Sequence, residues 1–335
     1  MKTLLLGGGG FIGFGIANHL LRAGGYDLTI ADNFFRQGGE PDRHIKDLEK
    51  GGVKIVSGDF TDPRSFDDLD RFDQVYMLAS VVGVDYVNSI PHEIIRINSM
   101  LIINTLEWIR KKGCGRALFS STSEAYAGAI EQFDYCIPTP EEVPLVVQDI
   151  SHPRFTYAVT KMLGESGFIN YADKLDFDSV IVRYHNVYGP RMGFKHVIPH
   201  LAQRFTDGES PFKVYGHDQT RSFNFIEDAV QGTVLAMEKG GAGQIYHIGD
   251  TVEITIDELV RFVGNIFEFD GRYENAPTYA GSVARRCPDI SKAMNELGYA
   301  PRINWKEGVR KTIDWYRSYL KNCESLHESF YDRSS

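Results

Sequence analysis

The stretch from Leu6 to Gly13, with the sequence LGGGGFIG, decides the fold of this chain. The apolar run from Lys2 to Leu6 precedes it, and the segment from Phe11 to Arg22 follows it with apolar side chains at helical spacing. Glycines alone are a weak signal, because flexible loops also collect them. A strand before these glycines and a helix after them predict a tight strand-to-helix turn that can hold a dinucleotide.

The glycines of this turn have separate expected roles. Gly7 can make the tight turn, Gly10 lets the backbone approach a pyrophosphate, and Gly13 permits close packing of helix on strand. The helix N-terminus at Phe11 and Ile12 then offers unpaired N–H groups and a partial positive charge to phosphate oxygens. We therefore predict that these five residues bind a cofactor.

An acidic residue follows the turn at about the expected 20 residues. Asp32 ends the second apolar run, where a carboxylate can accept hydrogen bonds from both ribose hydroxyls. It would repel a 2′-phosphate, which favours NAD over NADP, although the nearby Arg36 leaves NADP open. Asp59 and Phe60 follow the third apolar run and are candidates to border the adenine, with a structural turn as the alternative.

Short apolar runs alternate with helical segments through the first half of the chain, which indicates parallel strands with right-handed crossovers. The expected class is α/β, a Rossmann-type doubly wound sheet with a smaller C-terminal lobe. The expected strands span 2–6, 28–31, 53–56, 74–78, 116–120 and 179–183, and the expected helices 11–22, 43–50, 63–69 and 91–111. We assign 1–180 to the NAD-binding domain, 181–325 mostly to a substrate-binding lobe, and 326–335 to a tail.

Composition sets limits on the partners of the chain. Its 335 residues are 42% hydrophobic and 24% charged, as in ordinary globular proteins. The formal charge of −9 argues against a nucleic-acid or anionic membrane surface. The four cysteines form no CxxC pair and no metal spacing, so we expect reduced thiols and no metal site. No apolar stretch approaches the roughly 20 residues that span a bilayer, and we expect a soluble cytoplasmic protein.

A tyrosine and a lysine share one face of a later helix. Tyr157 and Lys161 are four residues apart, and most such pairs are simply solvated. A phenol with a pKa of about 10 is a poor base at neutral pH. Lowering this pKa by about three units requires about 4 kcal/mol, which an adjacent ammonium and a cofactor pyridinium can supply together. After a dinucleotide turn, the pair indicates a catalytic tyrosine and a lysine that also holds the nicotinamide ribose, and both residues are predicted cofactor contacts.

Hydroxyl groups and a carboxylate follow the fifth apolar run. The segment from Ser120 to Gly128, SSTSEAYAG, places Thr122, Ser123 and Glu124 directly after that run. A run of hydroxyls followed by a carboxylate is an unusual end for a buried strand, and the family resemblance given in the next paragraph implies that all three residues lie in the catalytic site. A structural alternative for Glu124 is capping of the segment or pairing with an arginine.

These segments together resemble the extended short-chain dehydrogenase/reductase family, in particular its NAD-dependent nucleotide-sugar epimerases, dehydratases and decarboxylases. The resemblance covers nearly the whole chain and is specific for the family, but not for one reaction. The segments that carry it are Gly7 with Gly10 and Gly13, Asp32-Asn33, Gly58-Asp59, Leu78-Ala79-Ser80, Asn98, Ser121 to Glu124, Tyr157 with Lys161, Arg183 to Arg191, Val214 to Gly216, Thr220-Arg221, and Arg286 to Lys292.

The resemblance implies a first step at C4 of a nucleoside-diphosphate hexose. Tyr157 takes the proton of the 4-hydroxyl, Thr122 steadies the same oxygen, and NAD takes the hydride. The implied cofactor contacts further include Asn33, Leu78, Ala79 and Ser80, and the implied substrate contacts are Asn186, Arg191, Tyr215, Arg221 and Arg286. A homodimer is also implied, through four helices contributed by 91–111 and by the Tyr157 helix of each subunit.

Glu124 is the residue on which the second step depends. In 4,6-dehydratases of the family, a glutamate at this place removes the C5 proton and a neighbouring aspartate protonates the leaving 6-hydroxyl; here the neighbour is Ser123. We expect burial to raise the pKa of Glu124. Decarboxylation would instead need a cation at the sugar carboxylate, with Arg285 or Arg286 as candidates.

Among the candidate reactions we rank 4,6-dehydration slightly ahead of decarboxylation, and 4-epimerisation is the alternative. Two other classes stay open: a net dehydrogenase or reductase of a nucleotide sugar, and a non-catalytic NAD-binding regulator. Neither the base nor the sugar of the substrate follows from the sequence.

Overall fold

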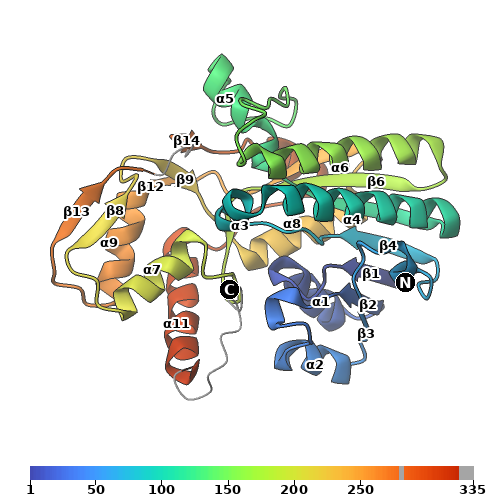
Figure 1. The fold of residues 1–335 in the computed structure, drawn as a ribbon, viewed down its shortest axis with the longest axis horizontal. Helices are drawn as coiled ribbons and strands as arrows, with labels where there is room; N and C mark the ends of the chain where they lie inside the picture. Colours follow the sequence, from blue (N-terminus) through green and yellow to red (C-terminus); the bar gives the residue numbers. More distant parts are fainter. Residues whose placement is uncertain (279–282, 324–335) are drawn as a thin grey trace.

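The computed structural model of the protein describes residues 1–278 and 283–323, so the predicted tail 326–335 lies outside the described residues. Its centre is a seven-stranded parallel sheet in the order β11-β6-β5-β4-β1-β2-β3 (Figure 1). The predicted Rossmann-type fold is confirmed. The strands of this sheet are β1 (Lys2–Leu6), β2 (Asp27–Asp32), β3 (Lys54–Ser57), β4 (Phe72–Met77), β5 (Cys114–Thr122), β6 (Asp178–Tyr184) and β11 (Gln244–Ile248).

Helices cover both faces of the sheet. Helices α1 (Phe11–Ala23), α8 (Ile226–Lys239) and α10 (Ser291–Leu297) share an apolar core with one face. On the other face, α4 (Pro91–Lys112) and α6 (Phe155–Lys174) run side by side (Figure 1). The shorter helices of this half are α2 (Arg43–Lys50), α3 (Val84–Ser89) and α5 (Ala127–Phe133). Because α8, β11 and α10 follow residue 180 in the chain, the second half also completes the core.

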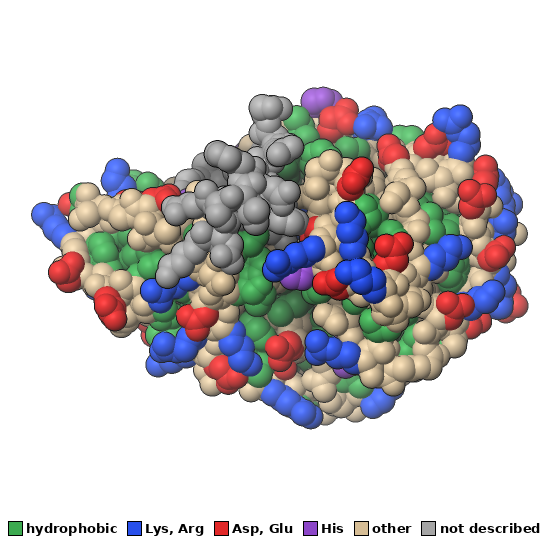
Figure 2. All heavy atoms as spheres, turned by 90° about the horizontal axis from the view of Figure 1, so that it is seen from below, with side chains coloured by type: hydrophobic (Ala, Val, Ile, Leu, Met, Phe, Trp, Pro, Cys, Tyr) green, Lys and Arg blue, Asp and Glu red, His purple; other side chains and the backbone are tan. Residues whose placement is uncertain are grey.

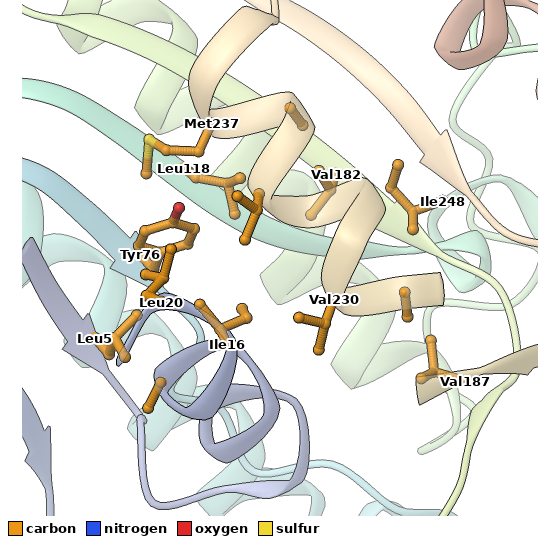
Figure 3. Packing of buried hydrophobic residues seen from close by; sticks show 14 of the residues in the cluster. Leu5, Ile16, Leu20, Tyr76, Leu118, Val182, Val187, Val230, Met237 and Ile248 are labelled. Carbon is orange, nitrogen blue, oxygen red and sulfur yellow. The ribbon is translucent and has the colours of Figure 1, made fainter. Parts of the chain in front are cut away.

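Aliphatic side chains of two helices interlock with the strands beneath them (Figure 3). Ile16 and Leu20 of α1 and Val230 of α8 are at most 4% exposed. Removing such surface from water contributes about 1.5–3 kcal/mol per side chain. The close-up shows these residues together with Leu5, Tyr76, Leu118, Val182, Val187, Met237 and Ile248.

One predicted helix takes a tighter form. Residues 63–69 were expected to form an α-helix, but only a 3₁₀ turn forms, η2 (Pro63–Phe66). Asp62 caps the turn by accepting from the Arg64 N–H, and Leu69 N–H donates to Phe66 O, three residues back. The tight turn buries both Phe66 and Leu69 in the core just before β4 begins.

The smaller lobe has its own core of aromatic and aliphatic side chains. Phe205 and Phe212 stack there with ring centroids 3.9 Å apart. A capping box begins α9, where Thr255 and Glu258 exchange hydrogen bonds. The elements of this lobe are α7 (Val197–Thr206), α9 (Ile256–Ile266), α11 (Trp305–Cys323), β7 (Val187–Tyr188), β8 (Phe212–Tyr215), β9 (Thr220–Ser222), β10 (Asn224–Phe225), β12 (Glu253–Thr255), β13 (Tyr273–Ala276) and β14 (Arg285–Arg286), with a further 3₁₀ turn, η1 (Phe35–Gln37), in the first half.

Charges of both signs are mixed over the surface in Figure 2, without a broad field of one sign on that face. Among the described residues, no helix is both long and apolar enough to cross a membrane.

Candidate active site

The glycine turn is built so tightly that side chains cannot enter it. Gly7 has a φ of +84°, and a Cβ there would lie 2.4 Å from Ala79 N. A Cβ on Gly13 would lie 2.5 Å from Gly7 O, so the helix rests directly on the turn. Gly10 has no side chain near its Cβ position, only Gly7 O at 3.3 Å. Since the first turn of α1 contains no acidic residue, its N–H groups keep their positive field for phosphates.

Asp32 stands beside this turn with its carboxylate held in place. Oδ2 accepts from Gly9 N–H at 2.9 Å, and Oδ1 accepts from Phe34 N–H at 2.8 Å. Burial raises the pKa of Asp32, and the two backbone hydrogen bonds and Arg36 oppose this shift. Each oxygen retains acceptor capacity for a ribose hydroxyl. The turn and its acid therefore fit a dinucleotide.

The two residues predicted at the adenine, Asp59 and Phe60, and the cofactor contact Asn33 implied by the resemblance differ in what the structure gives them. Asn33 Oδ1 accepts from Phe35 N–H at 3.0 Å in an exposed turn. Asp59 Oδ1 accepts from both the N–H and the hydroxyl of Thr61, which favours the structural alternative for its side chain. The ring of Phe60 is 3% exposed and packs against Phe66 in the core, which favours the structural alternative for its side chain as well.

The loop after β4 closes over the glycine turn. Leu78 and Ala79 N–H both donate to Leu6 O, at 2.8 and 2.9 Å, and Ser80 follows them. Asn98 of α4 fixes the next residue, accepting from Val81 N–H at 2.8 Å and donating to Val81 O at 3.1 Å. The predicted segment 78–80 thus lies where a cofactor bound at the turn would pass.

The end of β5 and one face of α6 bring the predicted catalytic groups together. Lys161 is 3% exposed, and its Nζ donates to Ser120 O at 2.8 Å. The same Nζ lies 5.6 Å from the centroid of the Tyr157 ring. Thr122 hydrogen-bonds to Tyr157, and its Oγ1 also accepts from Glu124 N–H at 3.3 Å.

Burial acts on the protonation of both members of this pair. Burial raises the pKa of Tyr157, as does the charge of Glu124, while the Thr122 hydrogen bond and Arg36 act in the opposite direction. Burial also lowers the pKa of Lys161 to about 7. Burial therefore opposes the acidification of the phenol, which was expected from Lys161 and the cofactor pyridinium acting together. The protein without its cofactor holds a neutral phenol.

Glu124 is clamped between two guanidinium groups. Its Oε1 lies 2.6 Å from Nη1 of Arg286, and its Oε2 lies 3.3 Å from Nη2 of Arg154. Burial would raise the pKa of Glu124, but the two arginines outweigh it and lower that pKa to about 2. The expected raised pKa is wrong. Ser123, whose hydroxyl lies 3.5 Å from the same Arg286 nitrogen, is buried beside it.

Sequence reasoning missed Arg154 and could have found it. It stands three residues before Tyr157, at the entrance of the helix that carries the catalytic pair. In the structure its side chain reaches Glu124, which follows β5. The position of Arg154 three residues before Tyr157 was the sequence signal that could have identified it as a site residue.

Two further arginines were predicted to hold the substrate, and they lie on adjacent strands. Arg221 of β9 and Arg286 of β14 are register partners, so their side chains begin side by side. Burial, and then the charge of Arg286, lowers the pKa of Arg221 to about 10. Arg285, in contrast, pairs with Glu253 at 2.7 Å and points away from Glu124.

The other predicted substrate residues divide into two groups. Asn186 has a φ of +38° at the end of β6 and donates to Ser222 O at 2.8 Å, beside the arginine strands. Tyr215 lies in the smaller lobe, where the Arg204 guanidinium stands 5.5 Å from its ring centroid.

Arg191 has a structural contact in place of the predicted substrate contact. Its Nη2 forms a buried ion pair with Asp42 at 2.9 Å. Its guanidinium also lies 4.2 Å from the ring centroid of Phe14. A buried arginine committed to a carboxylate and an aromatic ring is not free for a phosphate, so we no longer assign it to the substrate.

Fold and site together define an enzyme of the short-chain dehydrogenase/reductase type, with a dinucleotide turn in front of a Thr–Tyr–Lys group. A family model described as the NAD dependent epimerase/dehydratase family matches residues 3–249, and the chain belongs to this family. Its cofactor is NAD. The predicted class of activity, epimerase/dehydratase-type chemistry on nucleotide sugars, is confirmed.

Individual relatives carry out different reactions. The chain is 30% identical over 327 residues to a UDP-N-acetyl-alpha-D-glucosaminuronate decarboxylase of Bacillus cytotoxicus, covering 94% of this chain and 98% of the relative. It is 29% identical to a dTDP-glucose 4,6-dehydratase of Streptomyces antibioticus, covering 95% and 92%. The UDP-glucose 4-epimerase structure of Thermotoga maritima superposes with a TM-score of 0.82 at 27% identity, covering 96% of this chain and all of that one.

Proposed function

We propose that this enzyme decarboxylates a nucleoside-diphosphate uronic acid through a 4-keto intermediate. The observation that carries the proposal is the clamp formed by Arg286, Glu124 and Arg154. Together with Arg221, three guanidiniums face one carboxylate. This excess of positive charge suits a substrate that brings a pyrophosphate and a carboxylate of its own.

The same clamp makes 4,6-dehydration less favourable than the sequence indicates. A dehydratase needs a base for the C5 proton and an acid for the leaving 6-hydroxyl. A carboxylate with a pKa of about 2 is a weak base, because proton-transfer efficiency follows basicity. The acid position holds Ser123, which cannot supply a proton near neutral pH. We therefore place decarboxylation ahead of dehydration.

The proposed reaction begins at the C4 hydroxyl. When bound, NAD accepts the C4 hydride and later returns it, so that no net cofactor is consumed. Tyr157 accepts the 4-hydroxyl proton, Thr122 holds the oxygen, and Lys161 supplies positive charge beside the phenol. Since the phenol is neutral in the protein alone, the positive charge of the bound nicotinamide is needed to make it a base.

The second step breaks the bond between C5 and C6. A ketone at C4 makes the C6 carboxylate a β-keto acid, so the electron pair of the breaking bond moves into an enolate over C4 and C5 while CO2 leaves. Arg286 would hold the carboxylate until departure, and Arg154 would keep Glu124 ionised and away from it. A proton from water would then add to C5, and Tyr157 would return the 4-hydroxyl proton to its oxygen as the hydride is restored to C4.

The proposal is tested with paired substrates that differ only at C6. We expect the NAD-loaded protein to convert a UDP- or dTDP-linked glucuronic acid to a product lighter by one CO2. The matching UDP- or dTDP-glucose should show no loss of water. Mass spectrometry separates the outcomes. Loss of water from the glucose would favour dehydration, and unchanged mass with altered retention would favour 4-epimerisation.

We also propose that the protein is a homodimer that acts in carbohydrate biosynthesis, with α4 and α6 of each subunit as its interface. Five large apolar side chains on these helices are 36–49% exposed. Scattered apolar residues are common on surfaces, but a cluster on two adjacent helices favours an interface. The residues are Ile95, Met100 and Ile103 of α4 and Val159 and Leu163 of α6.

Replacing Leu163 with Asp is expected to convert the dimer to a monomer, because a charge would have to be buried in the apolar contact. Light scattering after gel filtration should give twice the chain mass for the unmodified protein and the chain mass for the variant. Ile150→Asp is the control, since Ile150 is 84% exposed outside these helices and its replacement should keep the dimer. A monomeric unmodified protein at micromolar concentration would exclude the interface.

A further inference from the structure

A buried carboxylate lies one helical turn beyond the catalytic lysine. Glu165 follows Lys161 by four residues on α6, so the two side chains share one face of the helix. Both residues are 3% exposed. An ionised carboxylate at this depth needs partners, because an unpaired buried charge is very costly.

The partners of Glu165 come from two strands of the sheet. Arg183 of β6 donates twice to it, from Nε at 2.8 Å and from Nη2 at 2.7 Å. The hydroxyl of Ser121 in β5 donates to Glu165 Oε1. The preceding residue, Ser120, provides the carbonyl that receives the Lys161 ammonium at 2.8 Å. The end of β5 therefore holds Lys161 through one residue and Glu165 through the next.

Few charged groups face the lysine from the elements around it. On α6 they are Tyr157 and Glu165, and Glu165 also pairs with Arg183 of β6 at 2.7 Å. Helix α4 presents the neutral Asn98, which donates to Thr160 at 3.3 Å. Beyond the phenol, Glu124 and Arg36 act on Tyr157 with opposite signs. Within the described residues, Glu165 is thus the acid that offsets burial at Lys161.

We propose that Glu165 is a positioning residue that keeps Lys161 protonated and fixed beside Tyr157. The inference rests on the proposed roles of Tyr157 and Lys161 in the first step. Burial lowers the pKa of Lys161 to about 7, and Glu165 raises it. Without the carboxylate, the effect of burial on Lys161 would be unopposed, and the pKa of the lysine would fall further.

The test compares Glu165→Gln with Glu165→Asp. Gln keeps the length of the side chain but removes its charge, whereas Asp keeps the charge and shortens the reach. We expect Gln to move the alkaline limb of the kcat profile to lower pH by about one unit, because Lys161 then loses its proton earlier. Asp should retain the limb of the unmodified enzyme. The melting temperature of each variant shows whether the fold is kept.

The possible outcomes separate this inference from the function on which it rests. A purely structural role of Glu165 predicts that both variants have lower melting temperatures and that Asp is affected at least as much as Gln. It also predicts that neither variant moves the alkaline limb of the kcat profile. This combination would overturn the inference. The proposed function fails separately, if turnover survives the loss of the Tyr157 hydroxyl. If the Gln variant does not fold, the pH profile of kcat for the Asp variant decides. A shift of its alkaline limb by one unit would contradict the inference that the charge at position 165 keeps Lys161 protonated.

Discussion

Tyr157→Phe is expected to lower kcat for a nucleotide-sugar substrate by about 10²–10⁴-fold, the usual contribution of a positioned acid–base group. The ring and its packing stay, but the oxygen that receives the sugar proton is lost. Because the hydroxyl bonds to Thr122 and not to the glycine turn, NAD affinity should change little. Steady-state kinetics and NAD binding by calorimetry measure the two effects separately.

A matched control stands on the same helix. Tyr171 of α6 donates to Glu107 Oε1 at 3.0 Å near the surface, at the far end of the helix from Tyr157. Tyr171→Phe removes the same atom and should leave kcat within about twofold of the unmodified enzyme. If Tyr157→Phe also kept full activity, both the proposed chemistry and the function of the Thr–Tyr–Lys group would be wrong.

The fold could be predicted well because local signals agreed. Apolar runs placed the first five strands within about two residues of their ends, as boundaries of this kind allow. The glycine turn was predictable because only glycine tolerates the φ of Gly7 and the contact at Gly13. The 3₁₀ turn at Pro63 was not predicted, since its form depends on burying Phe66 and Leu69 immediately before β4.

The site could be predicted as a set of residues but not as a set of charges. Tyr157 and Lys161 were found from their spacing, yet both pKa directions follow from burial, which one helix face does not reveal. Glu124 was found from its place after β5. Its two arginines come from 30 and 162 residues further along the chain, so its low pKa is a tertiary property.

Glu165 and Arg183 illustrate the same limit. Each is an ordinary charged residue in the sequence, and their pairing across α6 and β6 appears only when both are buried. Arg191 shows the opposite error. The family resemblance assigned it to the substrate, but in this fold it forms an ion pair with Asp42.

Arg286→Gln is expected to reduce CO2 release from the nucleotide-linked glucuronic acid by about 10²–10³-fold, the loss typical of removing one preorganised charge-stabilising donor. The first step does not use this guanidinium, so oxidation at C4 should continue. The hydride would then stay on the cofactor, and the absorbance of reduced nicotinamide should rise to about one equivalent per site. The unmodified enzyme should show little such absorbance during turnover.

Arg285→Gln is the control, since the neighbouring side chain belongs to the same short strand but pairs with Glu253 at the surface. It should release CO2 at the normal rate, which separates the local charge at Glu124 from a general effect on β14. Full CO2 release by Arg286→Gln would contradict the role proposed for Arg286. Arg154 would then be the cation to replace, because it is the other guanidinium in contact with Glu124. If Arg154→Gln were also fully active, the clamp would not hold the sugar carboxylate, and decarboxylation would lose its physical basis in this site.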